Sequence, residues 1–444
     1  MRSRAVAASV WLLCAAAASV YALAFYPGWL SFDSSYQWWQ ARSGEISNIN
    51  GIGIVLLWRV TLLLQDGPAP MLLLQLMLFW TGVAWIALAL PARPVFRLSL
   101  IAVLALAPAS WLLAQIWSDT ALLALLVLAT GAILRYRATG SRVFVAMAVF
   151  ALALAMSQRH NAMFAVVPLL LWLCGADGAM RWRRIAIAAS LTAVLLVGVQ
   201  LTTRLLTRQW FPVLPSLTLW DLSGMSVHEN RMLLPDYAVA PQSSVADLAS
   251  AYVPWSNTPL FASPRAGVRY PFQPWPEEEQ RRLTHDWLTT VARHPSAYLA
   301  HRGALLADLF GTRARELPAE LTFVPGPVQY RDNPVVAMHD SAPRRLARHA
   351  LDRLRDTVAF AAWPYLLIGA VAALHALRRR DSRSAPALWL CASAWAYALP
   401  YAVLAPAAEF RYLLWSCIAS LIAAWIRICG HASDTRAAAD AGTH

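Results

Sequence analysis

Residues 5–39 decide the fold: they read AVAASVWLLCAAAASVYALAF over positions 5–25 and YPGWLSFDSSYQWW over positions 26–39. The first part carries no charge, and about 20 apolar residues suffice for a helix to span the hydrocarbon core of a bilayer. Because this run is longer than the apolar core of a secretory signal peptide, we interpret it as an uncleaved first transmembrane helix. The polar and aromatic part then begins a loop outside the bilayer.

The same apolar pattern extends over the whole chain of 444 residues. Hydrophobic residues make up 59% and charged residues 14%, and the mean hydropathy is +0.47. These values argue against an ordinary soluble protein. We therefore expect an all-α polytopic membrane protein with about ten transmembrane helices. The expected spans are residues 5–25, 70–90, 97–113, 119–135, 143–157, 162–174, 185–205, 357–377, 385–404 and 412–428.

A shorter apolar stretch, Ile52–Leu64, contains Arg59. Its length and charge favour a helix that lies in the membrane interface, because a full span needs about 20 residues. The alternative is a tilted eleventh span.

All 37 basic residues are arginines, and the chain has no lysine. This excludes a P-loop ATPase and a pyridoxal enzyme, because both need a lysine. On one face of the expected bundle the short connections hold Arg2, Arg4, Arg93, Arg97, Arg135, Arg137, Arg142, Arg181, Arg183, Arg184, Arg378, Arg379, Arg380, Arg383, Arg427 and Arg436. Those on the opposite face hold only Arg42, Arg59, Arg159 and Arg411.

Short cytoplasmic loops are enriched in basic residues, so this asymmetry predicts the orientation. We expect a multi-pass protein of a bacterial inner membrane, with both termini in the cytoplasm and the functional site facing the periplasm. The net charge of +13 follows from the same bias. We therefore expect membrane lipids as neighbours and no nucleic-acid partner.

The spans divide the chain into four parts: an N-terminal transmembrane module at 1–205 with its first outward loop at 26–69, a periplasmic domain at 206–356, a C-terminal transmembrane module at 357–430, and a disordered tail at 431–444. Clustered prolines predict that the outward domain is mixed or irregular in structure. Within it, Asp221, His294, His301 and Arg302 belong to two distinctive stretches. We interpret them first as contacts inside a folded domain.

Two aspartates stand at the start of expected helices on the outward face. Asp33 lies in the aromatic stretch after the first span, and Asp119 lies in the turn Trp117-Ser118-Asp119 between the third and fourth spans. A partly desolvated carboxylate suits a general base. Two such carboxylates could also hold a divalent metal such as Mg²⁺ or Mn²⁺. The structural alternative for each aspartate is an N-cap.

Polar residues occur at two further outward turns. Arg159 and His160 lie between the fifth and sixth spans, and Glu409, Arg411 and Tyr412 open the last span. The arginine fork suits a phosphate group, and a histidine can bond a phosphate or a sugar hydroxyl. The alternatives are a solvated loop tip for the first pair and a simple ion pair between Glu409 and Arg411.

Aromatic residues surround Asp33 in the sequence. Most of the 21 tryptophans of the chain fit the role of interfacial anchors. Aromatic faces also stack on sugar rings, which makes Tyr36 and Trp38 candidates for substrate binding.

This layout resembles the GT-C class of integral-membrane glycosyltransferases, which use polyprenyl-phosphate-linked sugars and include bacterial lipid A aminoarabinose transferases and protein mannosyltransferases. The likeness extends over nearly the whole chain. It rests on Phe32-Asp33-Ser34, Trp117-Ser118-Asp119, Arg159, the large outward domain and Arg411-Tyr412. The chain departs from the class at Asn48-Ile49-Asn50-Gly51, where relatives often have an acidic-Trp-His-Pro stretch. It also departs in placing the outward domain between the seventh and eighth spans.

The resemblance implies a GT-C-like fold and an inverting transfer of a sugar from a polyprenyl-phosphate donor to a glycan, lipid or protein acceptor of the cell envelope. It assigns the base to Asp33, a supporting or metal-binding role to Asp119, and neutralisation of the lipid phosphate to Arg159 and Arg411. Apart from the metal, no cofactor is expected. The alternatives are an O-antigen polymerase or ligase, and a transporter or flippase for lipid-linked saccharides.

Overall fold

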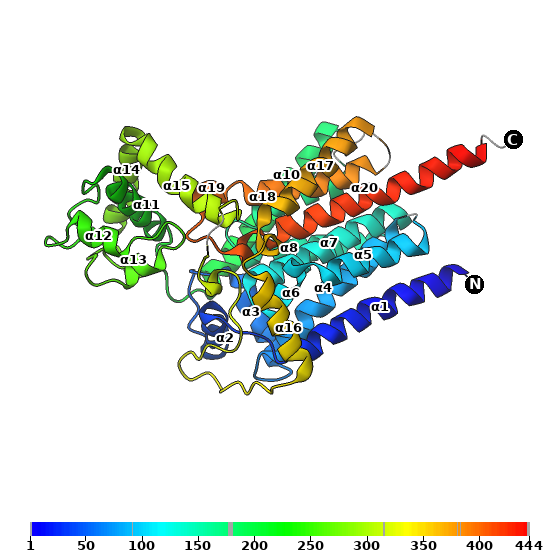
Figure 1. Cartoon of the computed structure of the whole chain (residues 1–444), viewed down its shortest axis with the longest axis horizontal. Helices are drawn as coiled ribbons and strands as arrows, with labels where there is room; N and C mark the ends of the chain where they lie inside the picture. Colours follow the sequence, from blue (N-terminus) through cyan, green and yellow to red (C-terminus); the bar gives the residue numbers. More distant parts are fainter. Residues whose placement is uncertain are drawn as a thin grey trace.

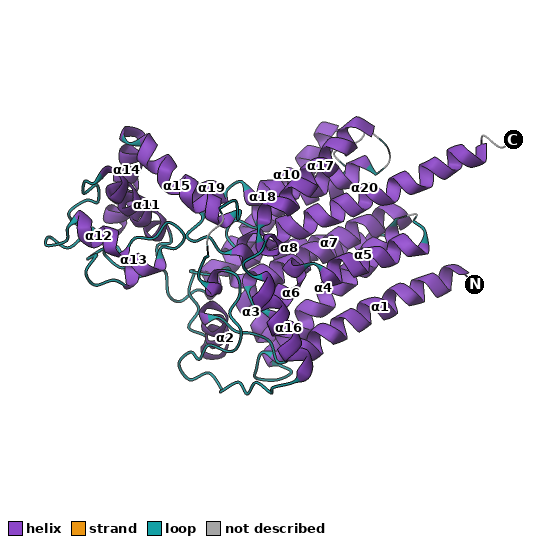
Figure 2. Ribbon diagram, in the orientation of Figure 1, coloured by secondary structure: helices purple, strands orange, loops and turns teal. Residues whose placement is uncertain are grey.

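The computed structural model of the chain is built from helices and loops. It describes residues 2–90, 92–175, 181–313, 316–379, 381 and 383–441. Within these ranges there is no β-strand, only isolated bridges between pairs of residues. Figures 1 and 2 show a long bundle of helices with a smaller helical lobe at one end. The expected all-α class is confirmed.

Six helical segments are long and apolar enough to cross a membrane. They are α1 (Arg2–Phe25), α4 (Ala69–Ala89), α7 (Ser118–Thr139), α10 (Arg181–Leu206), α18 (Ser384–Ala398) with α19 (Tyr401–Leu404), and η4 (Phe410–Leu413) with α20 (Leu414–Ala441). A seventh results if α5 (Pro94–Leu106) and α6 (Pro108–Trp111), which meet at a bend of 64°, form one span. The chain is thus a helical membrane protein.

The other expected spans also coincide with helices. These are α8 (Arg142–Gln158), α9 (Met163–Leu173) and α17 (Ala362–Arg379). By length and composition, however, the structure supports six or seven crossings, against the ten expected from the sequence. The stretch from Ile52 folds as α3 (Ile52–Leu62), about half the length of a span.

Small residues allow the central helices of the bundle to pack closely. A Cβ atom on Gly131 of α7 would lie 2.6 Å from the carbonyl oxygen of Gly82 on α4. Such close backbone approach is typical of helix pairs in membranes. In contrast, Ala188 is the only buried residue of α10, so this helix presents apolar side chains to the outside of the bundle.

The lobe contains α11 (Leu214–Glu229), α12 (Val245–Ala251), α13 (Thr258–Ala262), α14 (Glu277–Arg293) and α15 (Pro295–Leu309). Helix α11 packs against α12, α14 and α15. Long loops connect these helices, as the prolines predicted. The expected mixed structure is not found in the described part of the lobe, because its regular elements are all helices.

The chain then returns from the lobe to the bundle through η2 (Ala319–Leu321), α16 (Ala342–Leu354) and η3 (Val358–Phe360). On the way it crosses α2 (Phe32–Ser43): Leu30 forms a bridge with Pro327, and Asn333 Nδ2 donates to the Ser35 carbonyl at 2.8 Å. Helix α16 then packs against α1. Residues 206–356 therefore comprise the lobe and a return segment that lies on the first outward loop.

The Arg2 end of α1 and the Ala441 end of α20 lie at the same end of the bundle, opposite the lobe (Figure 1). Near this end, Arg427 Nη1 and Nη2 donate to the two carboxylate oxygens of Asp381 at 2.6 and 3.0 Å. These bonds hold the pKa of Asp381 well below its usual range. The pair ties α20 to the connection between α17 and α18.

Three of the arginines that predicted the orientation cannot be placed in detail. Arg380 and the side chains of Arg2 and Arg436 lie outside the described residues.

Helix α20 continues to Ala441, although the sequence predicted a disordered tail from residue 431; alanine-rich sequence favours helix. Residues 442–444 also lie outside the described part.

Candidate functional site

Asp33 lies in the first turn of α2, but it does not cap this helix. The N-cap is Ser31, whose hydroxyl accepts from the Ser34 N–H at 3.4 Å, while the Ser34 hydroxyl accepts from the Ser31 N–H at 3.2 Å. The Asp33 carboxylate instead accepts a hydrogen bond from Arg411 Nη2 at 2.7 Å. Its side chain is 39% exposed, so a substrate can reach it.

Asp119 occupies the same position in the first turn of α7, whose N-cap is Trp117. Its two carboxylate oxygens lie 2.7 and 2.6 Å from Arg159 Nη1. The side chain of Asp119 is only 1% exposed. Because a buried carboxylate is stable as an anion only beside a cation, Asp119 and Arg159 depend on each other.

Arg411, in η4, connects the two aspartates. Its Nη2 binds Asp33, its Nε lies 3.8 Å from Asp119 Oδ2, and it forms an ion pair with Glu409. We call this group of five side chains the carboxylate–arginine cluster: Asp33, Asp119, Glu409, Arg159 and Arg411. The cluster brings together the residues that the sequence singled out at four separate outward turns.

Aromatic rings enclose both guanidinium groups. Arg159 Cζ lies 4.7 Å from the centre of the Tyr412 ring, and Arg411 Cζ lies 5.5 Å from the same ring and 4.9 Å from the ring of Trp117. Tyr401 stacks on Tyr412 with ring centres 5.2 Å apart. A cation is attracted to such ring faces, so the rings help to fix the arginines.

Trp117 and Tyr401 were not predicted as site residues. One signal in the sequence indicated a role for these two residues: each has an aromatic ring with a polar group within or beside an apolar span, where a polar group needs a partner. That signal does not indicate which neighbour a ring will meet in the folded chain.

Backbone pairing fixes the two helix starts that carry the aspartates. The Trp29 N–H donates to the Ala114 carbonyl at 2.9 Å, at the end of η1 (Leu112–Ala114), and the Ile116 N–H donates to the Trp29 carbonyl at 3.0 Å. Trp117 Nε1 also donates to the Ser31 hydroxyl at 2.9 Å. The N-cap residues of α2 and α7 are thereby joined.

Close packing between α3 and α8 sets the position of Arg159, which directly follows α8. A Cβ atom on Gly51 would lie 2.2 Å from the Gln158 carbonyl oxygen, so only glycine fits there. Asn48, three residues earlier, bonds the Phe211 backbone through both ends of its amide, at 2.8 and 2.7 Å. The stretch from Asn48 to Gly51 thus serves packing in the described structure.

Trp38 does not line the site. Its side chain is in the core, where Nε1 donates to Asp66 at 3.0 Å and the ring stacks on Trp58. The turn of α2 directs Trp38 toward α3, so no described contact supports its predicted role in substrate binding.

Tyr36 and His160 lie beside the cluster and have other partners. The Tyr36 hydroxyl donates to Ser47 at 2.9 Å, and its ring stacks between Phe32 and Trp39. His160 Nε2 lies 3.2 Å from the Asn48 carbonyl oxygen, as expected for a donated hydrogen bond. No described hydrogen bond or ring contact joins either residue to the cluster.

The cluster contains three carboxyl groups and two guanidinium groups. Burial raises the pKa of the Glu409 carboxyl, an effect that the nearby Arg411 guanidinium opposes. Asp33 and Asp119 both face guanidinium groups, and the described residues include no group of three His, Cys, Asp or Glu side chains that could hold a metal. In this arrangement arginines pair with the carboxylates that a divalent cation would need, and no step below passes through a metal.

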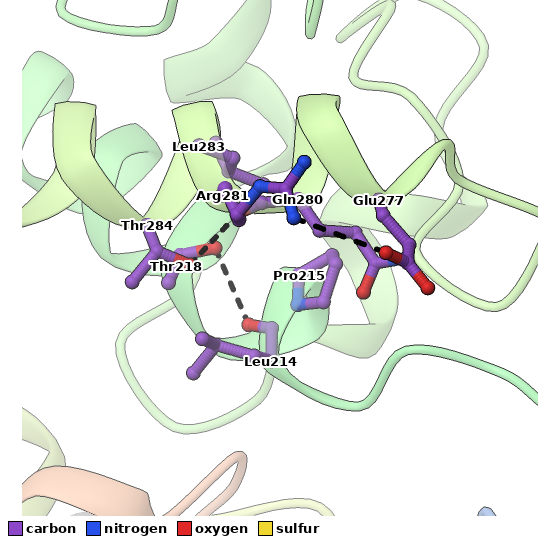
Figure 3. Close-up of a pocket in the computed structure, with 8 residues that line it drawn as sticks. All are labelled: Leu214, Pro215, Thr218, Glu277, Gln280, Arg281, Leu283 and Thr284. Atoms are coloured by element: carbon purple, nitrogen blue, oxygen red, sulfur yellow. Dashed lines mark hydrogen bonds and ion pairs between the residues drawn. The ribbon is translucent and has the colours of Figure 1, made fainter.

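A hollow of about 490 Å³ lies in the lobe, away from the cluster. Figure 3 shows it between α11 and α14, lined by Leu214, Pro215, Thr218, Glu277, Gln280, Arg281, Leu283 and Thr284. Its charged members, Glu277 and Arg281, are highly exposed and pair with each other. The hollow offers no buried reactive group, so we place the candidate site at the cluster.

Comparison with protein-family models, with curated proteins and with solved structures finds no match to this chain.

Proposed function

We propose that this protein is an inverting glycosyltransferase with a GT-C-like fold and about ten membrane spans. It moves a sugar from a polyprenyl-phosphate donor to a glycan, lipid or protein acceptor of the cell envelope. The reaction takes place on the periplasmic face of a bacterial inner membrane. Asp33 is the base, and Arg159 and Arg411 hold the phosphate of the donor.

One observation carries this proposal: a partly exposed carboxylate, Asp33, lies 2.7 Å from a guanidinium group, Arg411. Asp33 belongs to α2, which lies toward the lobe end of the apolar bundle (Figure 1). A carboxylate can take a proton from an attacking hydroxyl. A guanidinium can neutralise a phosphate that leaves. A lipid-linked donor needs both groups at the membrane surface, and this proposal therefore puts the cluster there.

In the proposed reaction, an acceptor oxygen attacks the anomeric carbon of the donor sugar while Asp33 accepts the hydroxyl proton. The bond between the anomeric carbon and the phosphate oxygen breaks, and its electron pair stays on the polyprenyl phosphate. Arg411 and Arg159 stabilise the charge that develops there. Asp33 then returns its proton to water.

The pairing of Asp33 with Arg411 gives the reaction an order. A donor phosphate that binds Arg411 Nη2 displaces the Asp33 carboxylate, which then becomes available to the acceptor hydroxyl. Donor should therefore bind before acceptor, and polyprenyl phosphate should compete with the donor.

The direct test is a transfer assay with the purified protein in vesicles that contain polyprenyl-phosphate hexoses or pentoses and envelope lipids. We expect a glycosylated lipid or glycan together with free polyprenyl phosphate, and competitive inhibition by polyprenyl phosphate. Release of polyprenyl pyrophosphate would support a polymerase or ligase. Movement of intact lipid-linked saccharide across the vesicle, without cleavage, would support a flippase.

The orientation is tested by alkaline phosphatase fusions, because this enzyme is active only outside the cytoplasm. A fusion after Val253, in the lobe, should be active, and a fusion after Arg379, at the end of α17, should be inactive. The reverse pattern would put the cluster on the cytoplasmic face and contradict the proposed location.

A further inference from the structure

The segment of residues 405–411, which carries Glu409 and Arg411 of the cluster, is held by the lobe. The Ala408 N–H donates to the Trp255 carbonyl at 2.8 Å, and the Asn257 N–H donates to the Pro406 carbonyl at 3.2 Å. From α15, Arg302 Nη1 donates to the Ala405 carbonyl at 2.8 Å. The position of Arg411 therefore depends on contacts made more than a hundred residues earlier in the chain.

Arg302 is itself fixed by a buried network inside the lobe. Its Nη2 lies 2.6 Å from Asp221 Oδ1 on α11, and His301 Nε2 lies 3.0 Å from the same oxygen. Asp221 Oδ2 accepts from Trp287 Nε1 at 2.9 Å, and His301 Nδ1 lies 2.8 Å from the Tyr252 hydroxyl. Asp221 and the His301 side chain are fully buried, and Arg302 is 3% exposed.

Close packing of α11 against α15 restricts how the side chains of this network can be arranged. A Cβ atom on Gly224 would lie 2.4 Å from His301 Nδ1, so α11 and α15 can approach each other only because residue 224 is glycine. Burial lowers the pKa of His301 and so favours the neutral ring, which can accept a hydrogen bond from Tyr252 at Nδ1 and donate one at Nε2. Asp221 and Arg302 then balance each other in charge.

A buried ion pair is weak evidence for stability, because its desolvation offsets most of its attraction. In this network the ion pair has a clearer effect on orientation. Because Arg302 Nη2 lies against Asp221, Arg302 Nη1 points at the Ala405 carbonyl. The sequence singled out Asp221, His301 and Arg302, and the structure joins them in one network, from which Arg302 reaches Ala405 outside the lobe.

We propose that Arg302, oriented by Asp221, is a positioning residue that fixes the 405–411 segment and through it Arg411. The lobe then controls donor binding at the cluster without contacting the donor. This inference rests on the proposed function for its effect on catalysis, but the docking contact can be measured without any substrate.

The docking test uses a cysteine pair at Ser256 and Ala407, which face each other in an antiparallel bridge. Opposed residues of this kind are close enough for a disulfide. The double variant Asp221→Asn/Arg302→Met, called the latch variant below, removes both charges of the buried ion pair together, so that no unpaired buried charge remains. We expect it to form the 256–407 disulfide roughly tenfold more slowly, the effect of losing one charge-assisted hydrogen bond.

The matched control is Arg269→Met/Glu279→Gln, which removes another ion pair of the lobe, 2.6 Å long, with no described contact to the 405–411 segment. It should leave the disulfide rate unchanged. An unchanged rate in the latch variant would overturn the proposal, as would an equal slowing in the control.

The kinetic constants of the latch variant distinguish an effect on donor binding from an effect on the chemical step. The latch variant should raise KM for the polyprenyl-phosphate donor about tenfold and change kcat less, and Arg302→Lys should restore part of the donor affinity. Slower disulfide formation with an unchanged donor KM would contradict the coupling to Arg411. If the wild-type protein transfers no sugar at all, the proposed function fails, whereas the disulfide comparison still decides the docking contact.

Discussion

Asp33→Asn is expected to lower sugar transfer by about 10²- to 10⁴-fold, the usual contribution of a general base. The amide keeps the shape of the side chain but cannot accept the hydroxyl proton. Its oxygen can still accept the hydrogen bond from Arg411, and α2 keeps its cap at Ser31. Protein level and donor binding should therefore stay close to those of the wild type. The measurement is initial transfer rate per molecule of protein in vesicles.

The matched control for this variant is Glu45→Gln in the same outward loop, because the partly exposed side chain of Glu45 bonds only Gln209 among the described contacts. Asp66, a further acidic residue of that loop, is unsuitable as a control because it accepts from Trp38 and Arg42. Wild-type turnover by Asp33→Asn would remove the proposed base and favour the polymerase or ligase alternative.

Arg411→Lys is expected to reduce kcat/KM for the donor about 10- to 100-fold, which corresponds to roughly 1.5–3 kcal/mol for a charged hydrogen bond. Lysine keeps the positive charge beside Asp33 and Glu409 but loses the planar fork that suits a phosphate. Arg411→Ala is the less informative change, because it leaves Asp33 and Glu409 without their cation and so threatens folding. The same reasoning applies to Arg159, whose removal would leave the buried Asp119 with only Arg411, whose Nε lies 3.8 Å away.

The conservative variant must be compared with Arg265→Lys, an exposed arginine of the lobe that has no described contact with the cluster. Both proteins should accumulate to the same level and melt at similar temperatures in detergent. An Arg411→Lys protein that accumulates poorly, yet transfers normally per molecule, would show that Arg411 supports the fold and does not bind the donor.

The sequence predicted the helical membrane class and the helix starts that carry the aspartates, because apolar runs define where each helix ends. Asp33 and Asp119 follow such runs, so their shared face could be inferred without coordinates. The sequence could not predict which cation each one binds. An aspartate at the start of a helix can also act as its N-cap. Neither aspartate does so here, because Ser31 is the N-cap of α2 and Trp117 is the N-cap of α7.

Other parts could not be predicted because they depend on tertiary packing. Trp38 and Tyr36 are two residues apart, yet the turn of α2 buries one and leaves the other beside Phe32. The prolines of the lobe indicated irregular structure, whereas burial of Asp221 and His301 between α11 and α15 organises its helices. The expected spans at 143–157 and 162–174 fold as α8 and α9, which are shorter than the roughly 20 residues of a full span.

The bond between Asp33 and Arg411 joins residues that are 378 positions apart. A ribosome adds about 5–20 residues per second, so Asp33 is made roughly 20–75 s before its partner. During that interval the first outward loop has already left the ribosome, and its carboxylate has only water or transient neighbours. The carboxylate–arginine cluster therefore forms at the end of biosynthesis, when η4 and α20 join the bundle. A chain that stops before η4 would have both aspartates and Arg159 but would lack Arg411, so under the proposed function we expect incomplete copies to be inactive.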